Sequence, residues 1–209
     1  MVADVEEERA ADFIDVRKLV SSMSVEELNR TAEQYFASLT FWDDHLAKPF
    51  SRAEDAPQLL INTGILLQAL LLVPGLTTLE YGAGTGWLSR YLTQLGCRAI
   101  LLDVSPTALN IARELYKRQP PIGERPEPRF LVFDGHRIEL EDASVDRVIC
   151  FDAFHHAANP DEILREFSRV LKLSGFAAFV EPGPMHSTTP QSQAPGAILS
   201  DISRAKMAL

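Results

Sequence analysis

Five short apolar runs, each separated from the next by a segment with helical spacing, occupy the second part of this 209-residue chain. They lie at residues 77–81, 98–102, 129–133, 147–151 and 176–180. Strands that alternate with helices pair in parallel, and each connecting helix crosses over one face of the sheet. The order therefore predicts an α/β fold, a three-layer sandwich with a mainly parallel sheet in its middle layer.

The residues before the first run predict helices. Ser24 and Glu27 have the spacing of a capping box, and apolar residues follow on one helical face. A second helix is predicted from Pro57 to Leu71, and its apolar content leads us to expect that it is largely buried. We divide the chain into an N-terminal helical lid or extension (1–73), a core (74–184), and a loop with a short helix that forms a truncated end of the core (185–209).

A glycine-rich turn joins the first run to the helix that follows it. Gly82, Gly84 and Gly86 occupy alternate positions there. Glycine takes positive φ and lets a ligand lie against backbone, while the start of the helix offers unpaired amides to a negative group. A tight turn with no ligand is the plainer alternative. A dinucleotide fingerprint would need a third glycine where Trp87 stands, and that side chain is too bulky for close packing of helix on strand.

The spacing of Glu80, Gly82, Gly84 and Gly86 resembles motif I, E/D-x-G-x-G-x-G, of class I S-adenosylmethionine-dependent methyltransferases. The resemblance extends from about Thr77 to Pro184. Within it, residues 151–156 and 169–175 are similar to the D-x-x-H-H and R-V-L-K-x-G stretches of small-molecule methyltransferases of types 11 and 12. It implies a Rossmann-like core, S-adenosylmethionine as cofactor and S-adenosylhomocysteine as product.

Two acidic residues follow strands at positions where the family binds its cofactor. Asp103 directly follows the second run, 21 residues after Gly82, where a carboxylate accepts hydrogen bonds from ribose hydroxyls. Two alternatives remain: a nicotinamide enzyme uses the same acid, and an aspartate at this position also simply ends a strand. Asp134 and Gly135 follow the third run at the family's adenine position, although Asp-Gly is also an ordinary turn. The resemblance implies cofactor contacts for Tyr35, Glu80, Gly82, Ala83, Gly84, Gly86, Asp103, Val104, Asp134, Gly135 and Phe151.

Glu80 and His155 are the residues with the most specific expected chemistry. A carboxylate at the end of a buried strand is costly unless it is paired, and by resemblance Glu80 orients the loop and the ammonium group of the cofactor. His155 lies just beyond the fourth run and is the candidate general base, whereas His156 caps or packs. No metal is expected, because Asp152, Glu181 and His186 have irregular spacing.

Composition restricts the partners. The formal net charge of −9 and the absence of an Asn/Asp-Pro-Pro-Tyr/Phe motif after the fourth run argue against nucleic acid as a partner. No apolar run approaches a membrane span, and the acidic N-terminus is unlike a secretory signal, so we expect no membrane association and a cytoplasmic location. Cys97 and Cys150 are expected to be small buried residues with no disulfide.

Members of this family add an antiparallel strand hairpin beside the fifth strand, but this chain has only 28 residues after Glu181 and no hairpin is visible in them. We expect the fifth strand to be an exposed edge that the last helix, a second copy in a homodimer or a further C-terminal domain covers. The predicted function is methyl transfer to a small molecule. A saccharide or lipid-linked metabolite is one acceptor expectation, from a weak resemblance of residues 186–193 to longer bacterial methyltransferases, some linked to sugar-transfer domains. The alternatives are a noncatalytic or degenerate nucleoside-binding domain and a nicotinamide-dependent oxidoreductase.

Overall fold

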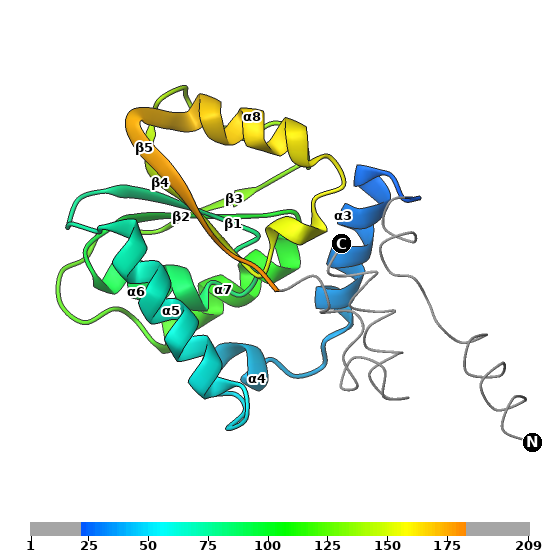
Figure 1. Cartoon of the computed structure of the whole chain (residues 1–209). Helices are drawn as coiled ribbons and strands as arrows, with labels where there is room; N and C mark the ends of the chain where they lie inside the picture. Colours follow the sequence, from blue (N-terminus) through cyan, green and yellow to red (C-terminus); the bar gives the residue numbers. More distant parts are fainter. Residues whose placement is uncertain (1–21, 183–209) are drawn as a thin grey trace, which may run out of the picture.

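The computed structural model of the chain describes residues 22–182, and within them five parallel strands form one sheet in the order β3-β2-β1-β4-β5 (Figure 1). Every strand pair is parallel, as the alternation of strands and helices predicts. The α/β fold is therefore confirmed. The strands are β1 (Thr77–Tyr81), β2 (Arg98–Asp103), β3 (Arg129–Val132), β4 (Val145–Phe151) and β5 (Leu171–Val180).

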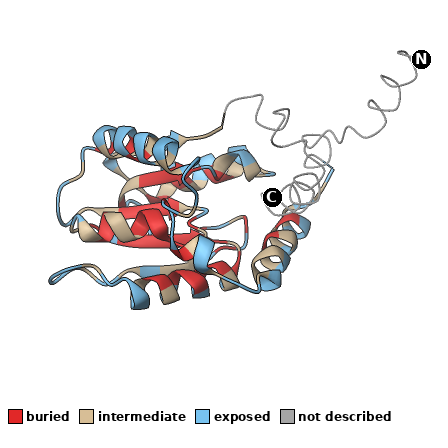
Figure 2. Ribbon diagram, turned by 90° about the horizontal axis from the view of Figure 1, so that it is seen from below, coloured by how far each residue is buried: buried red, intermediate tan, exposed pale blue. Residues whose placement is uncertain are grey.

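Helices cover both faces of the sheet. On one face α8 (Pro160–Val170) packs through Ile163, Phe167 and Val170 onto buried residues of the central strands. The opposite face is covered by α5 (Ala56–Leu70), α6 (Trp87–Gln94) and α7 (Pro106–Arg118). Figure 2 shows the buried residues concentrated in the sheet and on the inward sides of these helices. The remaining elements are α3 (Val25–Ser38), α4 (Asp43–Leu46) and a short 3₁₀ helix, η1 (Phe154–His156).

Local capping explains where two of the helices begin. The predicted capping box at α3 is present, since Ser24 Oγ accepts the amide of Glu27 at 3.2 Å and the Glu27 carboxylate accepts the amide of Ser24 at 2.8 Å. Ser105 caps α7 through the amide of Ala108. Asn159 occupies the corresponding position before α8, but its side chain makes no capping hydrogen bond. Its side-chain amide instead donates to the carbonyl of Gly135 at 2.9 Å.

Helix α5 begins and ends one residue before the predicted bounds, and the expectation that it is largely buried is wrong. Only Thr63, Leu66 and Leu70 are buried. Ile61 and Ile65 are 56% and 60% exposed. The helix carries apolar side chains around most of its circumference, but only one narrow stripe of them contacts the rest of the protein. Both cysteines, by contrast, are buried and unpaired as expected.

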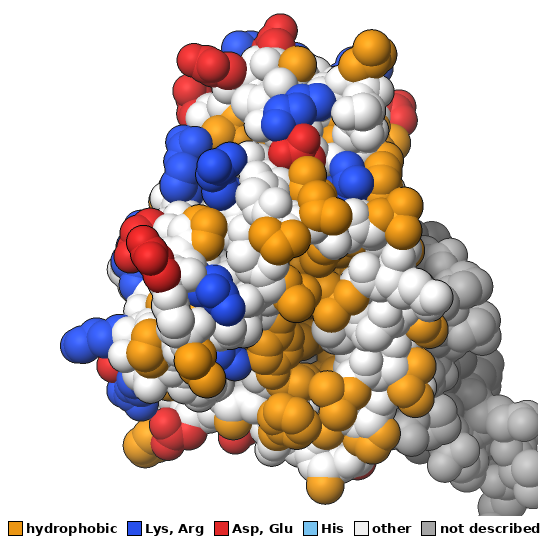
Figure 3. Space-filling view, turned by 90° about the vertical axis from the view of Figure 1, so that its left-hand side faces the viewer, with side chains coloured by type: hydrophobic (Ala, Val, Ile, Leu, Met, Phe, Trp, Pro, Cys, Tyr) orange, Lys and Arg blue, Asp and Glu red, His pale blue; other side chains and the backbone are white. Residues whose placement is uncertain are grey.

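Strand β5 begins earlier than predicted and forms one edge of the described sheet. It starts at Leu171, and a register shift separates its first pair with β4 from the regular pairs that begin at Phe176. Leu173 is fully exposed and Phe179 is 41% exposed. On the face seen in Figure 3, hydrophobic side chains gather along a hollowed strip. Residues 1–21 and 183–209, which include His186 and the expected last helix, lie outside the described residues.

Gly86 shows how tightly α6 and α7 approach the sheet. A Cβ at this position would lie 2.6 Å from Leu101 Cδ2 and 2.9 Å from Ala112 Cβ, and the residue has a φ of +75°. Gly86 therefore provides the close packing that a dinucleotide-binding turn obtains from its third glycine. By comparison, a Cβ at Gly64, on the surface of α5, would meet nothing within 4 Å.

These two glycines give a matched pair of substitutions. We expect Gly86→Ala to lower the free energy of unfolding by about 3 kcal/mol, because it combines backbone strain with overpacking. We expect Gly64→Ala to raise it by about 0.5 to 1 kcal/mol, because alanine favours the helix. Urea denaturation followed by circular dichroism measures both. Equal effects of the two substitutions would contradict this account of the packing.

Candidate functional site

Hydrogen bonds hold the glycine-rich turn against the end of β2. The amide of Gly84 donates to Asp103 Oδ2 at 2.7 Å, and the amide of Ala83 donates to the carbonyl of Leu102 at 3.0 Å. Gly82, Gly84 and Gly86 all have positive φ, at +66°, +51° and +75°. Because L side chains rarely adopt these angles, the structure requires glycine at the positions where the sequence places it.

The three glycines serve different purposes. A Cβ on Gly82 would lie 2.6 Å from Ala153 Cβ, so this glycine allows the segment after β4 to approach the turn. Gly86 serves helix packing, as described above. A Cβ on Gly84 would meet only a ring carbon of Phe36, at 3.9 Å. Gly84 is therefore the place where the turn leaves room for a ligand against the backbone.

Asp103 is buried at the carboxyl end of β2, and both of its oxygens accept backbone amides. Oδ2 accepts the amide of Gly84, and Oδ1 accepts that of Ser105 at 2.8 Å. Burial raises the pKa of Asp103 to about 6, against these two hydrogen bonds, and the nearby carboxylate of Glu33 raises it further. The side chain therefore holds the turn against the end of β2.

Glu80 lies on β1 beneath the same turn and is 3% exposed. Ser89 of α6 donates a hydrogen bond to its carboxylate. Burial raises the pKa of Glu80 to about 8, and the neighbouring charge of Asp103 adds to the increase. Two carboxyl groups with raised pKa values thus lie at one turn, which marks the turn as a candidate functional site.

Helix α3 crosses the carboxyl edge of the sheet. Asn29 Nδ2 donates to the carbonyl of Asp134 at 2.7 Å. The carboxylate of Glu33 accepts from Ser105 Oγ at 2.6 Å and from the amide of Thr107 at 3.1 Å, at the start of α7, where a negative charge is favoured. Partial burial opposes ionisation of Glu33, but the hydrogen bonds from Ser105 and Thr107 lower its pKa.

Sequence reasoning did not identify Asn29 or Glu33. The available signal was their spacing of four residues beside the buried positions Leu28 and Ala32, which places two polar side chains next to the packed face. Their partners lie more than 70 residues away in sequence.

Asp134 has its own local hydrogen bonds. Its Oδ1 accepts the amides of His136 at 2.7 Å and Arg137 at 2.9 Å, the pattern of an Asx turn. Gly135 lies directly beneath α3, and a Cβ there would overlap the side chain of Val25. The carboxylate of Asp134 is exposed beside this contact.

Aromatic side chains from the N-terminal segment pack above the turn. Phe36 is the ring that lies near Gly84, while Tyr35 packs edge-on against Phe36 with a centroid distance of 4.9 Å. Tyr35 Oη lies 3.3 Å from His45 Nε2. Burial lowers the pKa of His45 to about 4, and the nearby charge of Lys48 contributes to the decrease. A neutral, aromatic surface therefore covers this side of the turn.

The residues that end β4 lie beside β1 at the same edge. Phe151 is buried, and its ring packs edge-on against Trp87 with a centroid distance of 5.4 Å. Val104, after β2, is partly buried against the core. His155 Nδ1 lies 2.5 Å from a carboxylate oxygen of Glu181.

Of the described side chains, no three histidines, cysteines or acidic residues are grouped as metal ligands.

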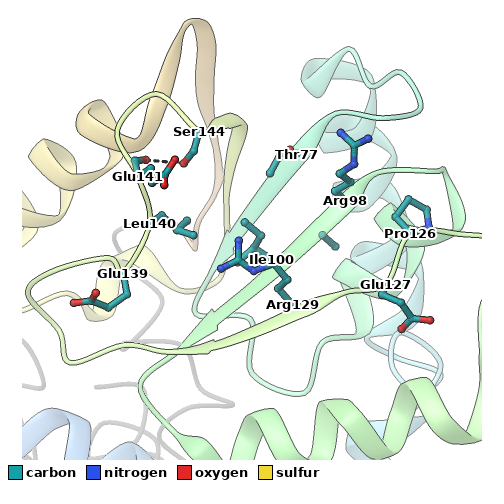
Figure 4. A pocket seen from close by; sticks show the side chains of 11 residues that line it. Thr77, Arg98, Ile100, Pro126, Glu127, Arg129, Glu139, Leu140, Glu141 and Ser144 are labelled. Carbon is teal, nitrogen blue, oxygen red and sulfur yellow. Dashed lines mark hydrogen bonds between the residues drawn. The ribbon is translucent and has the colours of Figure 1, made fainter.

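A cavity of about 720 Å³ lies at the amino ends of the strands, opposite the carboxyl ends that carry the candidate site (Figure 4). Thr77, Arg98 and Arg129, the first residues of β1, β2 and β3, contribute to its lining. Its wall also includes Glu127, Glu139 and Glu141. Ligands of parallel α/β sheets bind at the carboxyl ends of the strands, so the cavity is separate from the candidate site.

Comparisons with known proteins point to the same part of the chain. The family model of a methyltransferase domain matches residues 79–179, which run from β1 to β5. No helix within residues 22–182 is long and apolar enough to span a bilayer.

Two curated relatives and one solved structure illustrate the similarity. The chain is 34% identical over 107 residues to the human thiol S-methyltransferase TMT1A, covering 51% of this chain and 42% of that protein. It is 31% identical over 110 residues to the sarcosine/dimethylglycine N-methyltransferase of Halorhodospira halochloris, covering 52% and 38%. It is 25% identical to a SAM-dependent methyltransferase from Aquifex aeolicus, with a TM-score of 0.53 and coverage of 66% and 77%. The chain thus spans less than half the length of these two curated relatives.

The raised pKa of Glu80 predicts a dependence of stability on pH. The folded chain holds this proton up to about pH 8, whereas the glutamate of an unfolded chain releases it near its ordinary pKa of 4.5. Raising the pH through this interval therefore favours unfolding. Between pH 6 and 8 we expect the free energy of unfolding to fall by about 2 kcal/mol because of Glu80, with smaller contributions from Asp103 and His136. Glu80→Gln should remove the largest part of this decline.

Urea denaturation at pH 6, 7 and 8 measures the effect. Glu124→Gln, at an exposed loop position, is the control and should keep the slope of the parent protein. A slope that Glu80→Gln leaves unchanged would contradict the assignment to Glu80.

Proposed function

Because the chain belongs to the class I S-adenosylmethionine-dependent methyltransferases, we propose that it transfers a methyl group from S-adenosylmethionine to a small-molecule acceptor. The observation that carries the proposal is the turn at Gly84. Its amide donates to Asp103, and a Cβ there would meet only the ring of Phe36, at 3.9 Å. The net charge of −9 supports a small acceptor over a nucleic acid.

The residues at this edge of the sheet fit the cofactor. S-adenosylmethionine supplies an electrophilic methyl group on a sulfonium, and its departure leaves a neutral thioether. Asp103 would accept the ribose hydroxyls through the lone pairs that its two amide contacts leave available. Glu80 would favour the ammonium group, since its buried carboxyl lacks a cationic hydrogen-bond partner among the described residues and Ser89 is its donor.

The remaining contacts in the proposed site follow from the places of the residues at the strand ends. Asp134 would accept a hydrogen bond from the adenine amino group. It lies next to Gly135, which α3 covers. The aromatic surface that contains Tyr35 would close over the turn. Backbone contacts are proposed for Gly82, Ala83, Gly84, Gly86 and Val104, and a packing contact for Phe151.

The protein's own contribution to the reaction is mainly positioning. Methyl transfer from a sulfonium is an in-line displacement, so a closed site that aligns the acceptor behind the methyl group provides much of the rate. In our proposal His155 removes a proton from acceptors that require it. The relatives named above act on a thiol and on amines, and the core that they share with this chain therefore does not select the acceptor atom.

Substitutions at the turn test cofactor binding. We expect Asp103→Ala and Gly84→Val each to abolish binding of S-adenosylmethionine in calorimetric titration. Each hydrogen bond lost from the charged Asp103 is worth roughly 1.5 to 3 kcal/mol, which corresponds to about ten- to a hundredfold in affinity. Asp103→Asn, which keeps the shape of the side chain, should weaken binding at least tenfold.

Gly75→Val is the matched control for backbone strain. Gly75 also has positive φ, at +91°, but it lies in the turn before β1, far from the carboxyl edge, and a Cβ there would meet nothing within 4 Å. We expect it to bind S-adenosylmethionine as the parent chain does. Circular dichroism verifies the fold of each variant. Unchanged affinity in folded Asp103→Ala and Gly84→Val would reject the assigned site, and tight binding of NADH in place of S-adenosylmethionine would reject the family's cofactor.

Proton release upon binding tests the role of Glu80. With a pKa of about 8, its carboxyl is mostly protonated at pH 7, and a nearby ammonium group favours the charged form. Binding of S-adenosylmethionine should therefore release protons at pH 7, and affinity should increase between pH 6 and 8. Calorimetry in two buffers of different ionisation enthalpy measures the release directly. Glu80→Gln should bind without this release; the same release in both proteins would exclude Glu80 as its source.

A further inference from the structure

The side chain of Glu181, just after β5, joins the histidine segment after β4. Its Oε2 lies 2.5 Å from His155 Nδ1, and its two oxygens also accept the amides of Ala153, Phe154 and His155 at 3.3, 2.9 and 3.3 Å. Half-burial opposes ionisation of Glu181, but the hydrogen bonds from His155 and from the amide of Phe154 lower its pKa. The group at this position is therefore an ionised carboxylate that only accepts hydrogen bonds.

Three separate contacts fix the segment that carries His155. Ala153 lies against Gly82, so the segment touches the cofactor-binding turn. The ring of Phe154 packs among Tyr81, Phe167 and Phe179, with centroid distances of 6.4, 6.2 and 5.2 Å. Glu181 holds three consecutive amides from the other side. His155 is thereby placed at the carboxyl edge of the sheet on a backbone that packing and hydrogen bonds keep in one arrangement.

The contact with Glu181 determines which nitrogen of His155 carries the proton. A carboxylate accepts only, so Nδ1 must donate at 2.5 Å, and in the neutral ring the lone pair is then on Nε2. This is the tautomer that a general base needs when its Nε2 is to receive a proton, and a carboxylate on Nδ1 stabilises the imidazolium that results.

A purely structural role for Glu181 is the competing explanation, since a carboxylate that accepts three amides is also a good cap for a short 3₁₀ helix. The backbone contacts alone would satisfy that role. They do not require a histidine side chain at position 155 or a fourth contact to its ring, which is the shortest of the set.

We propose that Glu181 is a positioning residue that holds His155 as the general base for an acceptor with a proton-bearing oxygen or sulfur. This inference rests on the proposed methyltransferase function. The acceptor's lone pair forms the bond to the methyl carbon, the electron pair of the broken carbon–sulfur bond stays on the departing thioether, and the acceptor's proton moves to Nε2 of His155. The acceptor class differs from tertiary amines, whose neutral form attacks through its lone pair and gives up no proton during methyl transfer.

Nitrogen NMR of the 209-residue chain tests the tautomer without any substrate. In ¹⁵N-labelled protein at alkaline pH, with the His155 signals assigned by comparison with His155→Asn, we expect Nδ1 to be protonated and Nε2 to carry the lone pair. Glu181→Ala should return the ring to the Nε2-protonated form that histidine prefers in water. Glu181→Gln, which retains an acceptor oxygen for the backbone amides, is the second variant if the alanine variant does not fold. A lone pair on Nδ1 in the parent chain, or a tautomer that neither variant alters, would overturn the proposal.

Methyl transfer from radiolabelled S-adenosylmethionine to phenol, 2-mercaptoethanol and dimethylglycine tests the acceptor class. We expect transfer to the phenol or the thiol, a decrease in kcat of about a hundredfold in His155→Asn, and about tenfold in Glu181→Ala. KM for S-adenosylmethionine should remain within about twofold, and Glu124→Gln should match the parent chain. Methylation of dimethylglycine alone, or of no probe, would overturn the assigned class.

The two proposals fail separately. Loss of S-adenosylmethionine binding in the parent chain would reject the methyltransferase function itself. Normal binding together with a wrong tautomer, or with an unchanged kcat in Glu181→Ala, would reject only the role of Glu181.

Discussion

The hydrogen bond from the amide of Gly84 to Asp103 is the contact on which the candidate site depends. It joins the turn after β1 to the end of β2, and it needs a glycine with positive φ at one end and a buried carboxylate at the other. Glu80 lies beneath the same turn, so two carboxyl groups share a poorly solvated region. Burial raises the pKa of both groups, and a bound cation would favour their charged forms.

Helix α3 completes this region through polar contacts. Asn29 and Glu33 bond to the loop after β3 and to the start of α7, while Phe36 lies near Gly84. The helix is thereby oriented by directional hydrogen bonds at the carboxyl edge, whereas apolar packing alone would allow it to rotate or slide. The site is consequently assembled from three kinds of element: strand ends, the glycine turn and a helix that precedes the sheet in sequence.

Much of this was predictable because the signals are local. Alternating apolar runs and helical spacing predicted all five strands and their parallel pairing, and the capping box at Ser24 predicted the start of α3. The glycine residue type permits the positive φ of the three turn positions but does not by itself require it. The contacts of Glu33 and Glu181 were not predictable, since each joins residues that are distant in sequence. Periodicity also overestimated the burial of α5, because apolar composition does not specify how wide a stripe a neighbour covers.

The sequence by itself determined the order of strands and helices, the glycine turn and the acids at the strand ends, since each depends on residues close together in the chain. Only the tertiary structure decided which groups meet: that Asp103 binds the turn, that α3 lies over Gly135, and that His155 has a carboxylate on Nδ1. A sheet brings its strand ends together regardless of their separation in sequence, so the partners of these side chains are set by topology and packing, which no local pattern encodes.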